Sequence, residues 1–177
     1  MKKILVVVDM QNDFINGTLG TKEAQGIVEK AASLIEKFEG DIYVTMDTHQ
    51  SNYLDTAEGK KLPVAHCIKG TDGWLLNKRI METLDGKEYS TIEKGTFGST
   101  RLAEEIRIAG GQEEMEIECL GLCTDICVVS NVLLLKANFP ETKITVRADC
   151  CAGVTPETHE AALKTMEMCQ IEVEGTR

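Results

Sequence analysis

The sequence has no long apolar run and little positive charge. None of its apolar stretches reaches the roughly 18 residues that a membrane-spanning helix needs. Its 177 residues include 19 Lys and Arg against 29 Asp and Glu, a formal net charge of −10. Nucleic acids and anionic membranes are held by clustered basic side chains, and this sequence has no basic stripe. We therefore expect no nucleic acid and no membrane as a partner.

Several motifs of nucleotide-binding proteins and serine hydrolases are also missing. Two glycine-rich stretches, Gly70–Gly73 and Gly95–Gly98, fit neither the dinucleotide-binding fingerprint nor the P-loop, which needs Gly-Lys followed by Ser or Thr. The chain contains no Gly-x-Ser-x-Gly elbow, no internal repeat and no low-complexity tract. Those motifs therefore give no support to a nucleotide-binding protein or a serine hydrolase.

The cysteines and the N-terminus indicate a reducing compartment. The sequence has seven cysteines, an odd number that cannot pair completely within the chain. The first apolar stretch, Ile4–Val8, is shorter than the roughly 7–15 residues of a signal-peptide core, and no small-residue cleavage site follows it. We expect a reduced, cytoplasmic protein whose cysteines are mostly small buried side chains.

Apolar residues make up 42% of the chain and charged residues 27%, as in a globular protein. Six short apolar segments predict strands at Lys3–Val8, Asp41–Met46, Glu88–Glu93, Glu116–Leu120, Lys143–Ala148 and Ile171–Glu174. Amphipathic or buried helical patterns lie between them at Thr21–Phe38, Ser99–Ala109, Thr124–Ala137 and Pro156–Cys169. Alternating strands and helices predict right-handed βαβ units. We expect one α/β domain over residues 1–177, with a mostly parallel sheet covered by helices on both faces.

Three reactive side chains follow predicted strands: Asp9, Lys94 and Cys127. Ligands of open parallel sheets bind beyond the carboxyl ends of the strands. We expect Thr124 to cap the next helix, which places Cys127 near the third helical position, where free N–H groups and the helix dipole favour a thiolate. Together the three supply a nucleophile, an acid/base and a cation for covalent acyl transfer. The structural alternatives are an inert buried cysteine, a turn-capping aspartate and an exposed lysine.

The long irregular segment Asp47–Lys87, with one short helical patch around Leu75–Leu84, holds a second group of ionisable residues. Loops of that length usually carry function. The group comprises Asp47, His49, Asp55, Glu58 and His66. Carboxylates and imidazoles together suit Zn, Mn or Fe, although a hydrogen-bonded loop histidine is a common alternative. The third histidine, His159, lies on the polar start of a predicted helix, and we expect it to be structural.

Taken in order along nearly the whole chain, the motifs resemble those of the isochorismatase-like cysteine hydrolases, most closely the nicotinamidases. The resemblance rests on VDMQNDF at Val8–Phe14, DTH at Asp47–His49, His66-Cys67 with Gly70-Thr71, Lys94 with Phe97-Gly98, and GLCTDICV at Gly121–Val128. It implies a three-layer α/β/α fold with a six-stranded sheet in the Rossmann-like order 3-2-1-4-5-6.

The resemblance also implies a catalytic machinery. Asp9, Lys94 and Cys127 match the family's triad, a cis peptide is expected between Leu122 and Cys123, and the backbone N–H groups of Cys123 and Cys127 are expected to form an oxyanion hole. Isochorismatases proper lack this cysteine nucleophile, so the cysteine at position 127 favours amide hydrolysis over isochorismate as substrate.

One divalent metal ion (Zn, Mn or Fe) is implied on Asp47, His49 and His66. Many relatives have a further histidine a few residues beyond the Asp-x-His motif, and this sequence has none there. We prefer Glu58 to Asp55 as the candidate for the remaining ligand.

The resulting hypothesis is hydrolysis of nicotinamide to nicotinate and ammonia through a thioester on Cys127, which serves NAD salvage. Phe14 and Phe97 are expected to line the ring pocket, with core positions as the alternative. Two other hypotheses stay open: a related hydrolase of small carbamoyl or ureide amides, and a receiver-like switch module in which Asp9 is a phosphoacceptor or Mg²⁺ ligand and Cys127 has no role. Assembly into a homo-oligomer is also left open.

Overall fold

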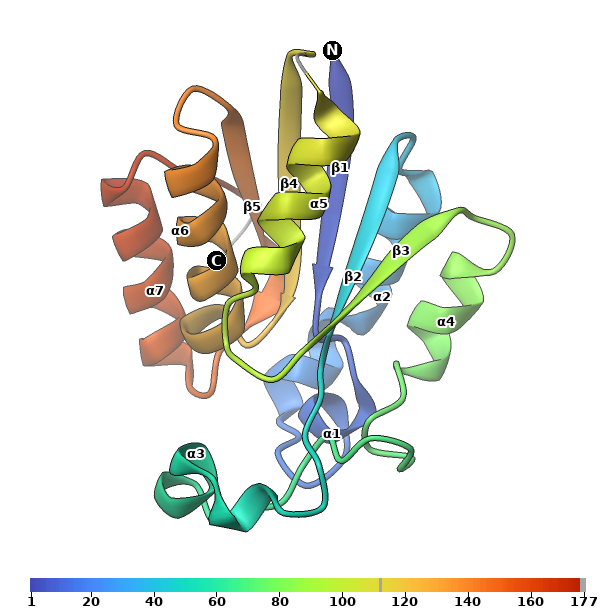
Figure 1. The fold of residues 1–177 in the computed structure, drawn as a ribbon, viewed down its shortest axis with the longest axis vertical. Coiled ribbons are helices and arrows are strands. Elements are labelled where there is room, and N and C mark those ends of the chain that lie inside the picture. Colours follow the sequence, from blue (N-terminus) through green and yellow to red (C-terminus); the bar gives the residue numbers. More distant parts are fainter. Residues whose placement is uncertain (112, 176–177) are drawn as a thin grey trace.

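A computed structural model describes residues 1–111 and 113–175, which form a sheet of six strands between two layers of helices (Figure 1). The order is β3-β2-β1-β4-β5-β6, and every neighbouring pair is parallel. The strands are β1 (Lys2–Val8), β2 (Asp41–Asp47), β3 (Tyr89–Lys94), β4 (Met115–Leu122), β5 (Lys143–Ala152) and β6 (Glu172–Glu174). The predicted fold class and the strand order implied by the resemblance are confirmed.

The central strand β1 shows why the chain forms three layers. Ile4, Val6 and Val8 pack into one hydrophobic cluster, while Leu5 and Val7 pack into another on the opposite face of the sheet. Successive side chains of a strand point to opposite faces. All five are completely buried, which explains why the apolar run is continuous rather than alternating.

Helices cover both faces of the sheet. Side chains of α5, α6 and α7 pack on the face of Ile4, whereas those of α2 and α4 pack on the face of Leu5. Four of the helices match predicted ones, and α4 falls within the expected helical patch. The helices are α1 (Asn12–Ile15), α2 (Lys22–Lys37), α3 (Ala57–Lys61), α4 (Lys78–Leu84), α5 (Thr100–Gly110), α6 (Val129–Asn138) and α7 (Pro156–Met168), with a 3-10 turn η1 (Tyr53–Asp55) and a π-helical turn η2 (Thr124–Val128).

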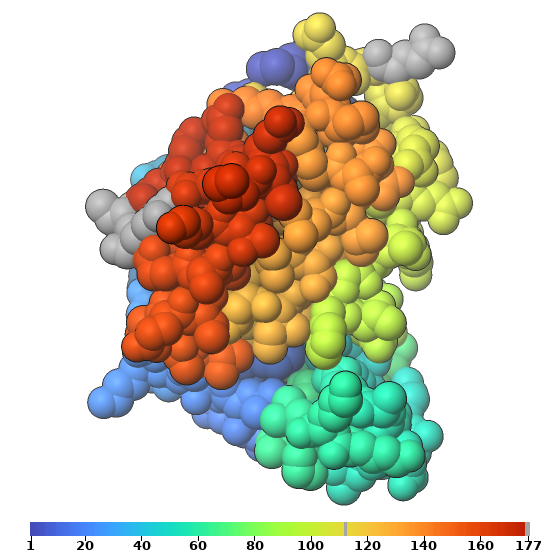
Figure 2. All heavy atoms as spheres, turned by 90° about the vertical axis from the view of Figure 1, so that its left-hand side faces the viewer, coloured from blue at the N-terminus to red at the C-terminus, as the bar shows by residue number. Residues whose placement is uncertain are grey.

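The carboxyl ends of the strands point to the lower end of the molecule in Figure 1, where α1 and α3 lie. Asp9 follows β1 directly, Asp47 ends β2, Lys94 ends β3 and Cys123 follows β4. Lys94 is therefore the last residue of its strand rather than the first residue after it. In the space-filling view, the lobe formed by η1 and α3 projects from the lower edge (Figure 2). None of the helices in the described residues is long and apolar enough to span a membrane.

Candidate active site

Asp9 sits in a turn that directs its side chain toward β2. Its backbone is in the left-handed region, with φ of 48°, which is costly for a residue other than glycine and is often found at functional sites. Its N–H donates to the Thr45 carbonyl (3.1 Å), and the Thr45 hydroxyl donates to Asp9 Oδ1 (2.6 Å). The carboxylate is thus fixed in a fully buried position.

Lys94 links Asp9 to the predicted nucleophile. Its Nζ lies 2.6 Å from Asp9 Oδ2 and 3.5 Å from Cys127 Sγ. A second carboxylate oxygen, Asp47 Oδ1, is 3.8 Å away. The structure therefore brings Asp9, Lys94 and Cys127 into one buried cluster at the carboxyl edge of the sheet.

Burial disfavours the charged forms of the carboxylate and the ammonium group in this cluster. Burial raises the pKa of Asp9 above its ordinary value, and the Lys94 ammonium offsets part of that rise. For Lys94, burial acts to lower the pKa, but Asp9, Cys127 and Asp47 outweigh it and the pKa is raised. Lys94 is therefore a permanent cation, and its ion pair with Asp9 stabilises a buried carboxylate that is otherwise costly.

The surroundings of Cys127 oppose ionisation of its thiol. Burial raises the pKa of Cys127 well above its ordinary value of 9.0, and Asp9 raises it further, while Lys94 acts in the opposite direction without overcoming them. The direction of this shift is opposite to the one predicted from the helix position of Cys127. The N-terminal helix position and the nearby cation do not compensate for loss of solvent.

The helix cap is also one residue earlier than predicted. Cys123, with extended backbone (φ −88°, ψ 145°), is the N-cap of η2, and Cys127 is the fourth helical residue. Thr124 does not cap the helix, because its hydroxyl forms a 2.8 Å hydrogen bond with His159 Nδ1 from α7. His159 thereby ties α7 to the turn that carries the nucleophile, in keeping with its predicted structural role.

The π-helical turn leaves the N–H of Cys127 in an unusual position. The Cys123 carbonyl accepts hydrogen bonds from the N–H groups of Ile126 (3.1 Å) and Val128 (3.0 Å), on either side of Cys127. Within the described chain, the N–H of Cys127 is not among the donors to that carbonyl. Single π-helical turns are frequent at functional sites. The expected cis peptide between Leu122 and Cys123 is confirmed.

Glycine at position 121 lets β4 approach β1 at this edge. Gly121 has φ of 126°, and a Cβ there would lie 2.1 Å from the Val8 carbonyl oxygen. Any side chain would push the two strands apart and would separate Asp9 from the nucleophile turn.

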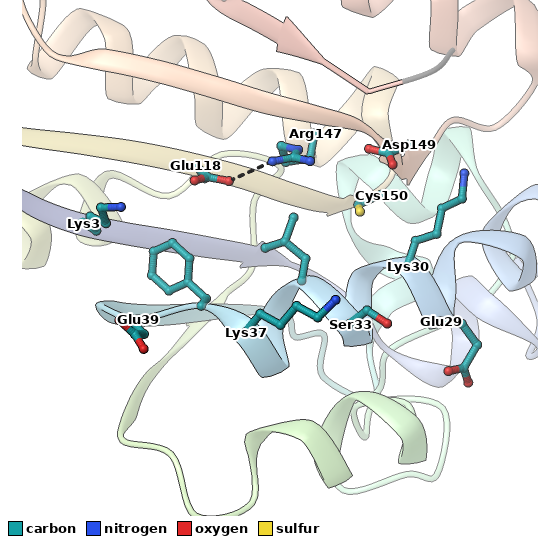
Figure 3. Close-up of a pocket in the computed structure, with 12 residues that line it drawn as sticks. Lys3, Glu29, Lys30, Ser33, Lys37, Glu39, Glu118, Arg147, Asp149 and Cys150 are labelled. Atoms are coloured by element: carbon teal, nitrogen blue, oxygen red, sulfur yellow. Dashed lines mark ion pairs between the residues drawn. The ribbon is translucent and has the colours of Figure 1, made fainter.

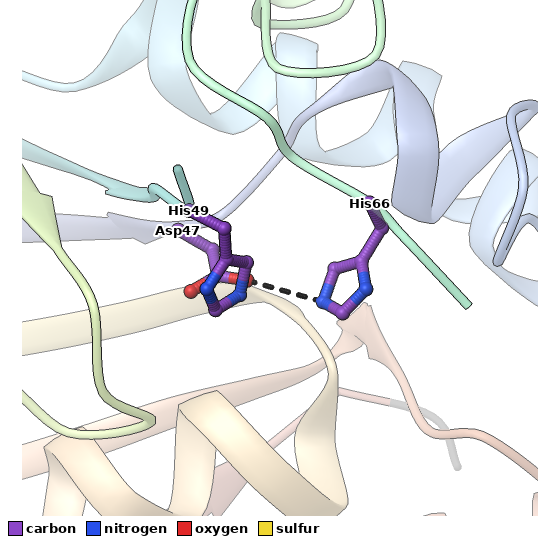
Figure 4. A group of neighbouring side chains, drawn as sticks. All are labelled: Asp47, His49 and His66. Atoms are coloured by element: carbon purple, nitrogen blue, oxygen red, sulfur yellow. Dashed lines mark hydrogen bonds and ion pairs between the residues drawn. The ribbon is translucent and has the colours of Figure 1, made fainter. Parts of the chain in front are cut away.

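Asp47, His49 and His66 form a second buried cluster beside the first (Figure 4). Asp47 Oδ2 lies 3.0 Å from His49 Nε2 and 3.5 Å from His66 Nε2. The Nδ1 of His66 donates to the Val64 carbonyl (2.8 Å), which orients the ring so that its Nε2 faces the cluster. Burial acts to raise the pKa of Asp47, but hydrogen bonds from both imidazoles lower it below its ordinary value. Two imidazoles and an ionised carboxylate that converge in this way fit a divalent transition metal.

Glu58, on α3, lies next to this cluster. Its Oε1 lies 3.7 Å from His49 Nε2 and 3.6 Å from His66 Nε2, and the Tyr53 hydroxyl donates to the same oxygen (3.5 Å). Asp55, the other candidate, is exposed in η1. The structure thus places Glu58, and not Asp55, beside the three ligand candidates.

The two predicted pocket aromatics differ in their surroundings. Phe14 is buried in α1, and its ring centroid lies 5.6 Å from that of His66. Phe97 is 45% exposed, on the loop between β3 and α5. Only Phe14 is held against a ligand candidate, and it also packs in the core cluster of α2 and α4.

Three polar neighbours of the site were not predicted from the sequence. Gln11, Asp13 and Thr45 are buried and hydrogen bonded to the segments that carry the site residues. The signal for Gln11 and Asp13 was present, because both lie in the motif Val8–Phe14. Thr45 lies in a strand where threonine is common and gave no such signal.

An open groove of about 730 Å³ lies elsewhere, between α2 and the strands β1, β4 and β5 (Figure 3). Its walls carry lysines and glutamates, and Arg147 pairs with Glu118 across it (3.5 Å). None of the predicted site residues lines this groove. The clusters around Cys127 and Asp47 therefore remain the candidate active site.

Comparisons with known proteins identify relatives of this chain. The family model described as "Isochorismatase domain" matches residues 3–177. The isochorismatase family protein PncA of Bacillus subtilis is 29% identical over 92% of this chain and 93% of its own length. A crystal structure of nicotinamidase/pyrazinamidase PncA from Bacillus subtilis superposes with a TM-score of 0.84 at 27% identity, covering 99% of this chain and all of that one.

Two further solved structures widen the comparison. Pyrazinamidase of Pyrococcus horikoshii, in complex with zinc, is 25% identical with a TM-score of 0.83 and covers 99% of this chain and 100% of its own. N-carbamoylsarcosine amidase from Thermoplasma acidophilum is 26% identical with a TM-score of 0.77 and covers 98% and 96%. Proteins similar to this chain thus include more than one kind of amidase.

Proposed function

Because the chain belongs to the isochorismatase family, whose nicotinamidase members hydrolyse amides, we propose that it hydrolyses nicotinamide to nicotinate and ammonia. The observation that carries the proposal is the contact of Lys94 with both Asp9 and Cys127, directly beside the Asp47 cluster. Lys94 thus lies next to both the proposed nucleophile and the side chains suited to a metal that binds the substrate.

In the first half of the reaction, Cys127 Sγ attacks the carboxamide carbon and Asp9 takes the thiol proton. Because the thiol pKa is raised, proton transfer accompanies the attack instead of preceding it. The Lys94 ammonium stays near both groups as the negative charge moves from Asp9 toward the substrate. Backbone N–H groups of Cys123 and Cys127 receive the oxyanion, and such donors contribute roughly 3–4 kcal/mol each in comparable sites.

In the second half, the tetrahedral intermediate expels the amide nitrogen, and Asp9 returns its proton so that ammonia leaves. The acyl group is then held on Cys127 as a thioester. Asp9, ionised again, removes a proton from water as the water oxygen attacks the thioester carbon. The carbon–sulfur bond breaks, the acid departs, and the proton on Asp9 returns to Cys127.

Asp47, His49, His66 and Glu58 are proposed to hold one divalent metal ion. A metal bound there supplies an electrophilic centre that accepts a lone pair of the substrate, such as that of a pyridine nitrogen. The buried Phe14 ring beside His66 offers an apolar wall for an aromatic substrate. Phe97 is exposed on the loop between β3 and α5, so it offers less support for a substrate contact than Phe14 does.

A second candidate substrate class is favoured by one comparison. The similarity to N-carbamoylsarcosine amidase supports a small carbamoyl amide, for which the metal ligands would be dispensable. The receiver-like switch module is not supported, since the hydrolase family model covers residues 3–177 and Cys127 lies in the same cluster as Asp9.

We also propose a cytoplasmic protein that folds as one domain over residues 1–177. All seven cysteines are free, although several are buried side by side on β4 and β5. Both hydrophobic clusters share the strands of one sheet.

The test measures ammonia release from nicotinamide and from N-carbamoylsarcosine, by wild type and Cys127→Ala, before and after chelation. We expect release from nicotinamide that needs both Cys127 and metal. Release only from the carbamoyl amide, insensitive to the chelator, selects the second candidate. Full activity of Cys127→Ala would refute the covalent mechanism for either substrate.

A further inference from the structure

Three buried side chains alternate along the segment that follows β1: Asp9, Gln11 and Asp13. Asp9 has a proposed catalytic role. Gln11 and Asp13 contact neither the thiol nor the metal-ligand atoms directly, yet both are held in hydrogen bonds with the segments that present those ligands. Gln11 is bonded to the backbone of Asp47, whereas Asp13 is bonded to the residue after His66. Each therefore contacts the segment of a different proposed metal ligand.

Gln11 binds both backbone groups of Asp47. Its Oε1 accepts from the Asp47 N–H (2.8 Å), and its Nε2 donates to the Asp47 carbonyl (2.8 Å). The same Nε2 also donates to the Trp74 carbonyl (2.8 Å). The Gln11 side chain is completely buried, so these bonds have no competition from water. Gln11 therefore fixes the backbone from which the Asp47 carboxylate projects.

Asp13 holds the turn that carries His66. Its Oδ2 accepts from the N–H of Cys67 (2.8 Å), the residue directly after His66. Cys67 has a left-handed backbone (φ 46°), which needs such support. The loop at Gly73 closes over the carboxylate, where a Cβ would lie only 2.1 Å from Asp13 Oδ2. Glycine at position 73 is thus required for Asp13 to keep this place.

We infer that Gln11 and Asp13 are positioning residues, which fix Asp47 and His66 relative to Asp9 through one five-residue segment. The inference rests on the proposed metal site. The segment sets the distance between the nucleophile cluster and the metal ligands before substrate arrives, and so favours substrates that can reach both.

The experiment is a titration with Co²⁺, followed by its visible absorption, in the Cys127→Ala background so that this thiol does not bind the metal. The variants are Gln11→Leu and Asp13→Ala. Loss of residues that orient metal ligands typically costs 10–100-fold in affinity, and we expect an increase of that size in the Co²⁺ dissociation constant, with a changed spectrum.

Two matched variants separate positioning from general disruption. Asp13→Asn keeps an acceptor for the Cys67 N–H, and we expect it to restore most of the affinity lost in Asp13→Ala. Asn12→Ala removes the intervening side chain, whose amide donates to the Asp72 carbonyl (2.8 Å) in an exposed contact, and should change the affinity less than twofold. If Asp13→Ala does not fold, Gly73→Ala displaces the Asp13 carboxylate without removing a polar group.

Co²⁺ affinity within twofold of the parent in cooperatively melting Gln11→Leu and Asp13→Ala proteins would overturn the inference. Absence of Co²⁺ binding in the parent would overturn it together with the metal site. A wild-type protein that binds Co²⁺ but releases no ammonia from nicotinamide contradicts only the proposed substrate, and the affinities still decide the role of Gln11 and Asp13.

Discussion

At the scale of single residues, the properties of Asp9 follow from its neighbours. The carboxylate is buried, bonded to Thr45 and paired with Lys94, and it lies beside a thiol that burial keeps protonated. A base with a raised pKa is better matched to a thiol than an ordinary carboxylate is. The resting pair of neutral thiol and carboxylate is therefore poised to exchange one proton.

The first prediction concerns pH. Asp9 must be ionised to accept the thiol proton, and its pKa is raised, so activity is complete above that pKa and is lost as pH falls through it. We expect the rate of Cys127 alkylation by iodoacetamide in metal-free protein to fall as pH is lowered, with an inflection above pH 3.8. Peptide mass spectrometry measures the alkylated fraction of Cys127.

The matched variant for this pH test is Asp9→Asn. It should lose the acid limb and react roughly 10²–10⁴-fold more slowly, the usual contribution of a general base. An inflection at or below the ordinary aspartate value in the wild-type protein would contradict the assignment.

At the scale of elements, the long segment after β2 differs most from what its sequence indicates. The strands and long helices have periodic apolar residues, and their existence was predicted with shifted ends. The short α1, η1 and α3 have one turn or little more, too few residues for a period to be recognised. Their positions depend on tertiary contacts such as those of Tyr53 with Glu58 and Leu62.

The second prediction separates the two acidic residues of this segment. Glu58→Gln keeps the side-chain shape but removes the charge near His49 and His66, and we expect about tenfold weaker Zn²⁺ binding in competition with a chromophoric chelator. Asp55→Asn, the control in the adjoining turn, should bind Zn²⁺ as the wild type does. Equal losses in both variants would indicate a general charge effect instead of ligation.

The nucleophile turn shows a different limit of sequence reasoning. Thr124 has the residue type and place of a helix cap, yet its hydroxyl binds His159, a residue from another helix. Capping preferences describe local competition for the first N–H groups, and a distant imidazole changes that competition without any local sign. Only the fold reveals that the cap lies at Cys123.

At the scale of the whole molecule, burial of thiols makes stability depend on alkaline pH. Burial raises the pKa of six cysteines above the ordinary 9.0: Cys67, Cys119, Cys123, Cys127, Cys150 and Cys151. In the unfolded chain these thiols ionise near their ordinary value. The unfolded state then binds fewer protons than the folded state, so the free energy of unfolding falls as pH rises above about 9.

The third prediction follows from that difference. Urea unfolding of the reduced, metal-free protein should show a free energy of unfolding lower by about 8 kcal/mol at pH 10 than at pH 8, about 1.4 kcal/mol for each of the six thiols. Between pH 6 and pH 8 the thiols should contribute no change. A stability that is the same at pH 8 and pH 10 would mean that the thiols are solvated in the folded protein.

The arrangement of the whole sheet was predictable, whereas the connections between its two clusters were not. Apolar strands alternating with helices indicate a parallel sheet, and the carboxyl-edge rule places Asp9, Lys94 and Cys127 together. Neither rule says which backbone a buried amide binds. The hydrogen bonds of Gln11 to Asp47 join the segment after β1 to the end of β2. They can be assigned only when the register of β1 on β2 is known.

The register of β1 on β4 has a consequence for biosynthesis. β1 pairs with β2 on one side and with β4 on the other, where Val8 is opposite Gly121. Because β2 is synthesised soon after β1 and β4 much later, β1 has no partner on its second side until β4 leaves the ribosome. During that interval the nascent chain presents an unpaired edge of a strand whose residues Ile4–Val8 are wholly buried in the finished protein. A chain interrupted before β4 would keep that edge exposed and would tend to pair with other chains, so it would be prone to aggregate.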